Sequence, residues 1–363
     1  MRILTILGTR PEIIRLSLII KKLDMFADKH ILVHTGQNFT RSLSGIFFED
    51  LEIRKPDYIL RESQQTFGEQ LSTIFLGIEK IILQEKPEKV LVLGDTNSAL
   101  SAVLAERMGI PVVHMEAGNR CFDLRVPEEK NRLVIDAISS LNLPYTPRSK
   151  ENLLREGIPV HKIIVSGNPI YEVLEHYKEN ISQSSILTKL GLEKRNYFLV
   201  TVHRAENVDD PPHLHGIFKG LILVAKTFQK RVICSIHPRT RSKLTKEIES
   251  DVKDLLEFHE PFSFFDFVCL EKNAFCTLTD SGTVQEESCL FRVPTVTFRN
   301  STERPETVEC GSNIISGTTA ENIVTCVKTM VQQSTDWKIP EGYADPDVST
   351  KVIKLLLGGK RGV

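Results

Sequence analysis

Short apolar segments that alternate with longer helix-forming segments place the strongest constraint on the fold of this chain. Expected strands occupy residues 2–7, 30–35, 89–94 and 112–116 in the first half, and 197–202, 231–236, 274–279 and 294–298 in the second. Expected helices occupy residues 11–23, 67–84, 97–108, 214–228 and 283–290. Strands and helices that alternate in this way are typical of parallel, doubly wound sheets. The sequence therefore predicts the α/β class, with two Rossmann-like halves that face a cleft.

Length and charge narrow the class of protein further. The chain has 363 residues, which is enough for two globular domains. Its net charge of −1 and its lack of a Lys/Arg block argue against nucleic-acid binding, which needs a basic face. Its apolar segments are too short to span a bilayer, and its first residues do not resemble a signal peptide. We therefore expect a cytoplasmic protein with no nucleic-acid or membrane partner.

The cysteines give no sign of a metal site. Seven are present, and no two of them form a CxxC pair. Free thiols in a reducing compartment are the simplest interpretation of this odd number. We expect no zinc site.

Polar residues follow the expected strands at their carboxyl ends, where open α/β sheets bind ligands. After the first strand, Gly8 permits a tight turn and Pro11 suits a first helical turn. Arg10 lies between them, where an anion binds to the start of a helix. The alternative is a simple helix start with an exposed arginine. The segment is not GxGxxG, so it gives little support for a dinucleotide site.

Acidic residues follow the next two strands. Asp95 lies in GDTN, where its side chain contacts a ligand or, as the alternative, caps the following helix. Glu116 begins EAGNR, where a carboxylate has no evident structural purpose. Glu128 and Arg132 are four residues apart and share one face of an expected helix. The alternative for this pair is a solvated ion pair worth about 0.3–0.5 kcal/mol.

The second half of the chain repeats this pattern. His203 and Arg204 are adjacent at the end of a strand, and His237 ends the next one. Ser281 and Gly282 follow another strand and precede a helix. A small polar turn at a helix start predicts a phosphate site formed by backbone N–H groups.

Charged residues continue beyond this turn. Glu287 lies six residues after Ser281, where a carboxylate can accept both hydroxyls of a ribose. The alternative for Glu286 and Glu287 is the preference of acidic residues for a first helical turn. Arg304 in TERPE follows the last strand and adds another cation. Seven strand ends thus carry charged or phosphate-binding residues, which independent capping explains poorly.

The motifs occur in one order: GTRPE, HTGQN, GDTNSALSA, EAGNR with VPEEKNR, TVHRAEN, TDSGTVQEES and TERPE. In this set the sequence resembles the non-hydrolysing UDP-N-acetylglucosamine 2-epimerases, from about residue 2 to about residue 317. The resemblance implies two Rossmann-like domains of the glycosyltransferase-B type, a UDP-sugar substrate, a homodimer, no metal and no other cofactor. It also implies a C-terminal helix that returns to the first domain. We therefore expect one domain of residues 1–168 with 343–363, and a UDP-binding domain of residues 169–342.

The functional residues of the family transfer to this chain motif by motif. The resemblance implies catalytic roles for Asp95, Glu116, Glu128 and His203. It implies contacts with the substrate or UDP for Arg10, Arg15, Arg132, Arg204, Phe267, Ser281, Gly282, Glu287 and Arg304. Arg15 stands where many members have lysine, and it keeps the charge.

The chain departs from the common pattern at residues 35–40, which are TGQNFT where many members have TGQH followed by R-x-M. In bacterial members this segment binds a second UDP-GlcNAc as an allosteric activator, together with residues that match Arg204 and His237. Gln37 and His237 are therefore the allosteric candidates. The missing histidine, and the Thr40 that replaces a glutamine, weaken the expectation that such activation operates.

Several activities stay open on the sequence alone. The segments EAGNRCFD and RVPEE also resemble relatives that act on modified sugars, in UDP-N-acetyl-L-fucosamine or UDP-diacetamido uronic acid synthesis. A hydrolysing relative that releases N-acetylmannosamine shares the same motifs. A glycosyltransferase of the same fold and a UDP-sugar-binding regulator are further alternatives.

The chemistry of epimerisation explains why these residue types are needed. No carbonyl activates the C2 proton, so the C1–O bond to UDP must break first, giving UDP and a 2-acetamidoglycal. The departing diphosphate needs cations and N–H donors, and the candidates are Arg10, His203, Arg204, Arg304 and the Ser281–Gly282 turn. The sugar needs acid–base groups on both faces. We expect Asp95 or Glu116 as the base at C2, with Glu128 opposite, in an order that the sequence leaves open.

Overall fold

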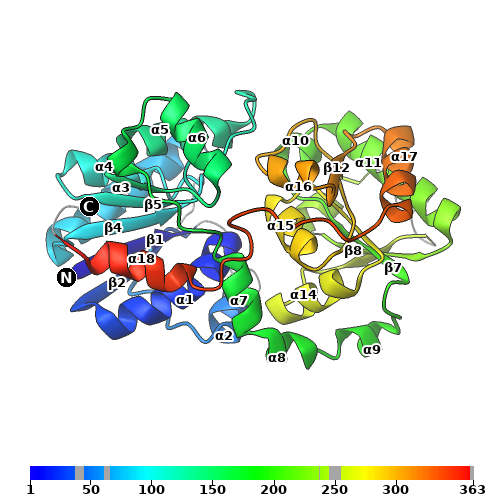
Figure 1. The fold of residues 1–363 in the computed structure, drawn as a ribbon, viewed down its shortest axis with the longest axis horizontal. Helices are drawn as coiled ribbons and strands as arrows, with labels where there is room; N and C mark the ends of the chain where they lie inside the picture. The colour runs from blue at the N-terminus through cyan, green and yellow to red at the C-terminus, as the bar shows by residue number, and fades with distance from the viewer. Residues whose placement is uncertain (37–44, 61–65, 237, 245–254, 360–363) are drawn as a thin grey trace. The chain divides into compact units, whose positions relative to one another are not determined.

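A computed structural model describes residues 1–36, 45–60, 66–236, 238–244 and 255–359 (Figure 1). The chain divides into two compact units. Unit 1 comprises Met1–His176 and Glu341–Val363, and unit 2 comprises Tyr177–Pro340.

Unit 1 is a six-stranded parallel sheet with helices between its strands, in the order β3-β2-β1-β4-β5-β6 among the described residues. This is the strand order of the doubly wound nucleotide-binding fold. Its elements are β1 (Arg2–Leu7), α1 (Arg10–Phe26), β2 (Lys29–His34), α2 (Ile46–Asp50), β3 (Tyr58–Ile59), α3 (Phe67–Glu85), β4 (Lys89–Leu93), α4 (Ser101–Arg107), β5 (Val112–Met115), α5 (Pro127–Ile138), β6 (Leu141–Leu143), α6 (Pro147–Arg155), the 3₁₀ helix η2 (Val160–Lys162), α7 (Ile170–His176) and α18 (Val348–Leu357).

Unit 2 repeats this topology. Its parallel strands follow the order β12-β11-β10-β7-β8-β9 in the described part of the chain. Its elements are α8 (Lys178–Ser182), α9 (Ile186–Leu190), β7 (Tyr197–Thr201), α10 (Ala205–Val208), α11 (Pro211–Phe228), β8 (Arg231–Ser235), α12 (Pro238–Arg241), β9 (Glu257–His259), α14 (Phe264–Asn273), β10 (Cys276–Thr279), α15 (Gly282–Leu290), β11 (Thr295–Thr297), α16 (Pro305–Glu309), β12 (Asn313–Ile315) and α17 (Ala320–Gln332). The predicted α/β class with two Rossmann-like units is therefore confirmed.

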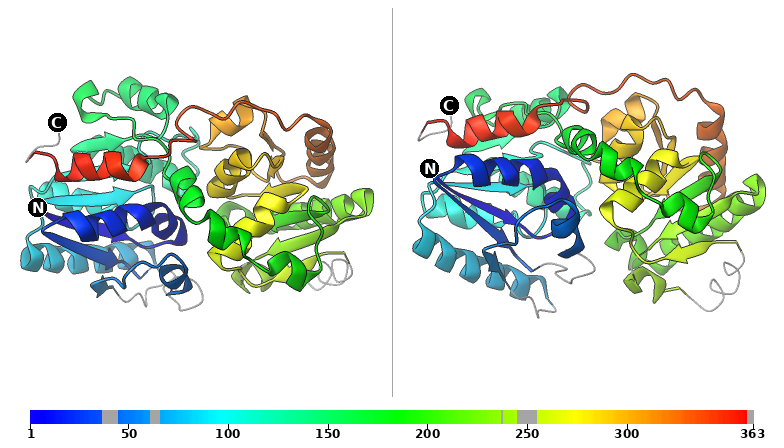
Figure 2. Two further views of the ribbon diagram at one scale, coloured as in Figure 1. Left: turned by 60° about the horizontal axis from the view of Figure 1, so that its bottom comes forward. Right: turned by 90° about the horizontal axis from the view of Figure 1, so that it is seen from below.

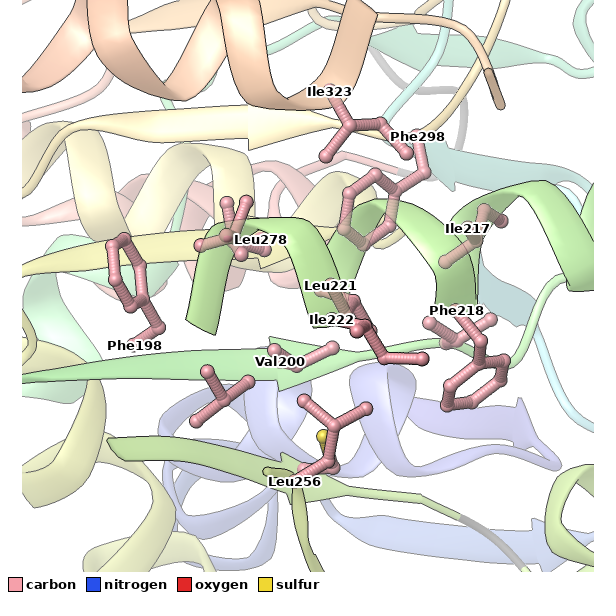
Figure 3. Packing of buried hydrophobic residues seen from close by; sticks show 14 of the residues in the cluster. Phe198, Val200, Ile217, Phe218, Leu221, Ile222, Leu256, Leu278, Phe298 and Ile323 are labelled. Atoms are coloured by element: carbon pink, nitrogen blue, oxygen red, sulfur yellow. The ribbon is translucent and has the colours of Figure 1, made fainter. Parts of the chain in front are cut away.

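Burial on both faces explains the apolar character of the central strands. In β1, every residue after Arg2 is buried, including Thr5. A strand of a parallel sheet carries helices on both faces, so it needs a continuous apolar segment and not an alternating one. The core of unit 2 is built in the same way, from β7, β10 and β11 beneath α11 and α17 (Figure 3). Phe198, Val200, Phe218 and Leu278 form part of this cluster.

The C-terminal helix α18 packs against α1 within unit 1, as Figures 1 and 2 show from three directions. Helix α7 also packs against α1, which explains why unit 1 extends to His176. Lys89, at the start of β4, fixes the end of α18. Its side chain is buried, and its Nζ donates to the carbonyl oxygens of Leu355 at 3.1 Å and Gly358 at 2.9 Å. A buried ammonium thus satisfies carbonyls that the end of a helix leaves without donors.

The structure extends the predicted set of elements at the sheet edges. No strand was predicted at β3, β6, β9 and β12, which have only two or three residues each. The helix expected at residues 97–108 begins at Ser101. Before it lies a series of tight turns, in which Ala99 N–H donates to Thr96 O and Ser101 N–H to Ser98 O. The side chain of Asp95 therefore does not cap this helix.

Two further features concern the described residues alone. A helix that combines the length and the apolar character of a membrane span is not found among them. All seven cysteines are described and carry free thiols, five of them buried.

Replacing Lys89 with methionine should destabilise unit 1 while keeping the volume of the side chain. The change leaves two carbonyl acceptors at the end of α18 without their donor, so we expect a loss of about 1–3 kcal/mol in the free energy of unfolding. Urea denaturation followed by circular dichroism measures it. Lys354→Met is the matched control, because Lys354 is exposed on the same helix. Equal stability of the two variants would contradict this role of Lys89.

Candidate active site

Polar residues gather where the strand order of each sheet reverses direction. In unit 1 the reversal lies between β1 and β4, and in unit 2 between β7 and β10. Open α/β sheets bind ligands beyond the carboxyl ends of strands at such switch points. Four of the predicted motifs follow these four strands: GTRPE, GDTN, TVHRAEN and TDSGT.

Glu12 joins the two loops at the switch point of unit 1. Its Oε2 accepts hydrogen bonds from Gly8 N–H at 2.9 Å and Thr9 N–H at 2.7 Å, and its Oε1 accepts one from Thr96 Oγ1 at 2.9 Å. Burial raises the pKa of this carboxyl to about 7, although the hydrogen bonds act in the opposite direction. Sequence reasoning missed this role, but the spacing of Thr9 and Glu12 is a capping-box signal that indicates it.

Arg10 follows these loops at the start of α1. Its guanidinium lies over the ring of Phe47, with 5.7 Å between Cζ and the ring centroid. Burial lowers its pKa from the ordinary value. Arg10 is half-buried, so the exposed arginine of the alternative is not what the structure has.

Arg132 holds the side chain of Asp95. Its Nε and Nη2 lie 2.8 and 2.7 Å from Asp95 Oδ2, and its Nη1 pairs with Glu129. Asn131 donates to the Asp95 carbonyl at 2.8 Å, so α5 fixes both ends of this residue. Arg132 is buried, and its helical partner is Glu129 and not Glu128. The alternative of a solvated pair between Glu128 and Arg132 is therefore wrong.

Glu116 follows β5 in a strained backbone conformation. Its φ is +66°, a left-handed value that a residue with a Cβ rarely adopts. Its carboxylate forms a buried ion pair with Arg15, which also lies over the ring of Tyr145 at 5.8 Å. Such strain concentrates at functional sites, where the surrounding contacts hold it. Gly118 completes the turn with φ +78°, and a Cβ there would lie only 2.2 Å from Ser149 O.

Glu128 differs from the other two carboxylates of this unit. It lies in the first turn of α5, and its Oε2 is buried with no hydrogen-bond donor among the residues that the structure describes. Buried polar atoms without a partner are uncommon and call for an explanation. A ligand that supplies the missing donor is one explanation.

His114 and Asp136 link the loops after β4 and β5 through buried hydrogen bonds. The ring of His114 places Nε2 at 2.8 Å from Gly94 O and Nδ1 at 2.8 Å from Asp136 Oδ1. Asp136 Oδ2 accepts from Gly118 N–H at 3.1 Å and from Arg120 at 2.7 Å. Burial alone would raise the pKa of Asp136, but His114 and Arg120 lower it below its usual range. His114 lies in β5 and Asp136 in α5, and neither belongs to a motif that was recognised in the sequence.

In unit 2, Asp280 takes the place that Glu12 has in unit 1. Its carboxylate accepts hydrogen bonds from the backbone N–H groups of His203 at 3.0 Å and Arg204 at 2.9 Å. Asn207 Nδ2 donates to it at 3.1 Å. The side chain is fully buried, so the loops after β7 and β10 share one buried carboxyl group. Asp280 belongs to the TDSGT motif, which the sequence analysis recognised, but no role was predicted for Asp280 itself.

Glu303 joins two arginines beside the predicted phosphate turn. It accepts from Arg204 Nη2 at 2.8 Å and from Arg299 Nη1 at 2.6 Å. Glycine at position 282 lets Glu303 approach closely, because a Cβ there would lie 2.7 Å from its Oε1 and would displace the carboxylate. Ser281 is the N-cap residue of α15, and Gly282 begins the helix. The turn predicted from the sequence is therefore present, with cations close to it.

Two glutamates of α15 lie beyond its first turn. Glu286 is buried and pairs with Arg304. Glu287 is buried beside Glu271, and burial together with the charge of Glu287 raises the pKa of Glu271 well above its usual range. The alternative that Glu286 and Glu287 serve a first helical turn is wrong, because α15 has no acidic residue there.

Three other predicted residues need separate mention. Phe267 lies on α14 and is half-buried. Gln37 and His237 lie outside the described residues. Among the residues that the structure describes, no group of three His, Cys, Asp or Glu side chains is arranged to hold a metal ion.

Fold and site together define an α/β protein built from two Rossmann-like units, each with charged and N–H groups at its switch point. The sequence profile of the UDP-N-acetylglucosamine 2-epimerase family matches residues 21–357. The chain therefore belongs to the UDP-N-acetylglucosamine 2-epimerase family.

Individual relatives match over nearly the whole chain. The UDP-N-acetylglucosamine 2-epimerase of Methanocaldococcus jannaschii is 40% identical, over 99% of this chain and 100% of its own. A crystal structure of the M. jannaschii enzyme in complex with UDP-GlcNAc and UDP has a TM-score of 0.94, over 99% of this chain and 100% of that one. The UDP-2,3-diacetamido-2,3-dideoxy-D-glucuronate 2-epimerase of Pseudomonas aeruginosa is 37% identical, over 91% of this chain and 92% of its own.

Glu12 should make the stability of this protein depend on pH. Its pKa is about 7 in the folded protein, against an ordinary value of 4.5. The folded state thus binds the proton more tightly, so the stabilisation is complete below pH 4.5 and is lost as the pH rises through 7. Glu12→Gln keeps an acceptor for Gly8 and Thr9 but does not titrate. We expect the free energy of unfolding of wild type, relative to this variant, to fall by about 2–3 kcal/mol across that window. Denaturant unfolding over pH 4–8 measures it, and parallel curves would contradict the assignment.

Proposed function

We propose that this protein is a non-hydrolysing 2-epimerase that converts UDP-GlcNAc and UDP-ManNAc into one another. Its family membership supports the reaction class, and one observation about the site carries the assignment. At its two switch points the protein presents the two kinds of group that this reaction needs. Unit 2 offers cations and helix N–H groups, and unit 1 offers carboxylates.

The reaction breaks and remakes two bonds. The C1–O bond to UDP breaks with its electron pair going to the diphosphate, and the C2 proton then leaves to give a 2-acetamidoglycal. A proton added to the opposite face of C2, followed by return of UDP to C1, completes the inversion. The diphosphate therefore needs stabilisation where its charge develops, at a site that also retains the intermediate.

We assign UDP to unit 2. The start of α15 presents the backbone N–H group of Gly282, and a nine-residue helix adds its positive end, whereas the Ser281 N–H donates to Thr279 Oγ1 at 2.9 Å. His203 lies half exposed at the neighbouring strand end, with Arg204 beside it. Phe267, Glu287 and Arg304 stay predicted contacts of the nucleotide.

We assign the reacting sugar to the carboxylates of unit 1, with Arg10, Arg15 and Arg132 as substrate or positioning cations. Asp95 and Glu116 are each paired with a buried arginine, which orients them. Glu128 has a buried oxygen that no described residue satisfies. This difference supports separate roles for the carboxylates. Glu128 exchanges a proton with one face of the sugar, and Asp95 or Glu116 acts on the other face.

A second candidate substrate is a UDP-2,3-diacetamido uronic acid. The specific observation is the 37% identity to the P. aeruginosa enzyme named for that sugar. The motif departures around Asn119 and Arg125 favour it as well. Both candidates use the same chemistry at C1 and C2, so they differ only in the groups that bind C3 and C6.

We further propose that the protein acts in the cytoplasm as a homodimer, as the family resemblance implies. Light scattering of the purified protein tests the assembly directly. A mass of twice 41.1 kDa is expected, and a monomer would contradict the proposal.

The reaction is tested by incubating the protein with UDP-GlcNAc in D₂O. We expect deuterium at C2 and formation of UDP-ManNAc, both followed by NMR. UDP-diacetamido uronic acid is offered in parallel, and exchange with that sugar alone would assign the second candidate. Release of free N-acetylmannosamine would show a hydrolysing enzyme, and no exchange with either sugar would overturn the proposal.

Glu128→Gln tests the catalytic group most cleanly. It leaves every described hydrogen bond in place, whereas Asp95→Asn also removes an ion pair from the buried Arg132. We expect C2 exchange to slow about 10²–10⁴-fold, as for loss of a general acid–base group, while UDP affinity stays unchanged. Glu151→Gln is the control, because Glu151 forms only an exposed pair with Arg155. Wild-type exchange by the Glu128 variant would refute the role.

A further inference from the structure

His114 joins two loops that carry predicted catalytic carboxylates. It lies in β5, and its side chain is buried. Its Nε2 is 2.8 Å from the carbonyl oxygen of Gly94, the residue before Asp95. Its Nδ1 is 2.8 Å from Asp136 Oδ1, and Asp136 Oδ2 accepts from Gly118 N–H at 3.1 Å. One buried ring therefore connects the loops after β4 and β5.

Both neighbours of this ring are hydrogen-bond acceptors. A carbonyl oxygen cannot donate, so the Nε2 that faces Gly94 must carry a proton. An ionised carboxylate cannot donate either, so the Nδ1 that faces Asp136 must carry one as well. A neutral imidazole has only one ring proton, whereas an imidazolium has two. The two contacts together therefore require the positively charged ring.

The alternative is a neutral ring whose Nδ1 accepts from a protonated Asp136, and the surroundings of this carboxyl oppose it. Asp136 Oδ2 accepts from Gly118 N–H and, at 2.7 Å, from Arg120 Nη2. Burial acts to raise the pKa of Asp136, but the hydrogen bonds and charges of His114 and Arg120 hold it below its usual range.

The balance of charge around the ring favours the imidazolium as well. Asp136 and Glu156 both pair with Arg120, and the side chains of Asp136, Arg120 and His114 are each only 1% exposed. With His114 charged, this cluster contains two cations and two anions. A neutral ring would leave a net negative charge in a largely buried place, which is costly.

We propose that His114 is a positioning residue that carries both ring protons, and that this buried imidazolium fixes the loops that present Asp95 and Glu116 to the substrate. Glu116 has a left-handed backbone, with φ +66°, so its loop needs contacts that hold it. Gly94 and Gly118, which these contacts hold, are left-handed too, at φ +74° and +78°. The catalytic consequence rests on the proposed function, whereas the charge of the ring is a property of the unliganded protein.

The ring protons are measured by ¹⁵N NMR of the unliganded protein at pH 7. The His114 signal is assigned by its loss in His114→Gln, or in His114→Asn if the first variant does not fold. We expect a directly bonded proton on both ring nitrogens. A wild-type ring with a bare Nδ1 or a bare Nε2 would overturn the proposal. This measurement needs no turnover, so it separates failure of this inference from failure of the proposed function.

His30 is the matched control, because it is also a buried histidine of unit 1 with a carboxylate partner. Its Nδ1 is 2.6 Å from Asp24 Oδ1, and its Nε2 is 2.9 Å from Thr5 Oγ1. A hydroxyl can donate as well as accept, so the contacts of this ring do not require a second proton. Neither partner belongs to the loops that His114 joins.

Kinetics supply the second test. His114→Gln keeps a side-chain donor but removes the charge and one of the two contacts. We expect kcat to fall on the order of 10²-fold, because small displacements of catalytic groups have effects of this size. The affinity for UDP, which we assign to unit 2, should not change, and His30→Gln should keep the wild-type kcat. Equal losses of kcat in the two variants, or a loss of UDP affinity as large as that of kcat, would refute the positioning role.

Discussion

A buried carboxylate at the switch point of each sheet is the interaction on which the candidate site depends. Strands of a parallel sheet end at one edge, but the loops beyond them are irregular and need partners for their N–H groups. Glu12 supplies acceptors for the loops after β1 and β4, and Asp280 does so for the loops after β7 and β10. Each unit thus uses one buried carboxyl group to fix two loops.

A second set of contacts holds the functional side chains that these loops carry. Buried arginines from α1 and α5 orient Glu116 and Asp95. In unit 2 Glu303 joins Arg204 and Arg299 beside the start of α15. Charges of this kind are costly to bury unless they are paired and hydrogen-bonded. The cost is tolerated here because a preorganised site needs fixed charges before its ligand arrives.

The carboxylates of the site therefore differ in their surroundings, and this difference gives them different chemistry. Asp95 and Glu116 face permanent cations, whereas Glu128 has an oxygen without a donor in the described part of the chain. Glu271 and Glu287 face each other, so one proton between them is favoured. Carboxyl groups thus occur here paired with a cation, without a donor or beside one another, and the surroundings of Glu128 support its proposed role in proton exchange.

The sequence by itself determined the two α/β units, their main strands and most of the residues at the strand ends. It could do so because buried parallel strands need continuous apolar segments, and because strand-end motifs such as GTRPE and TDSGT are local in the chain. The tertiary structure alone decided the partners. Arg132 pairs with Glu129 and Asp95, His114 contacts Gly94, and Asp280 faces His203. These pairs, apart from Arg132 and Glu129, join residues that are 20 or more positions apart, so only the order of the strands in the sheet brings them together.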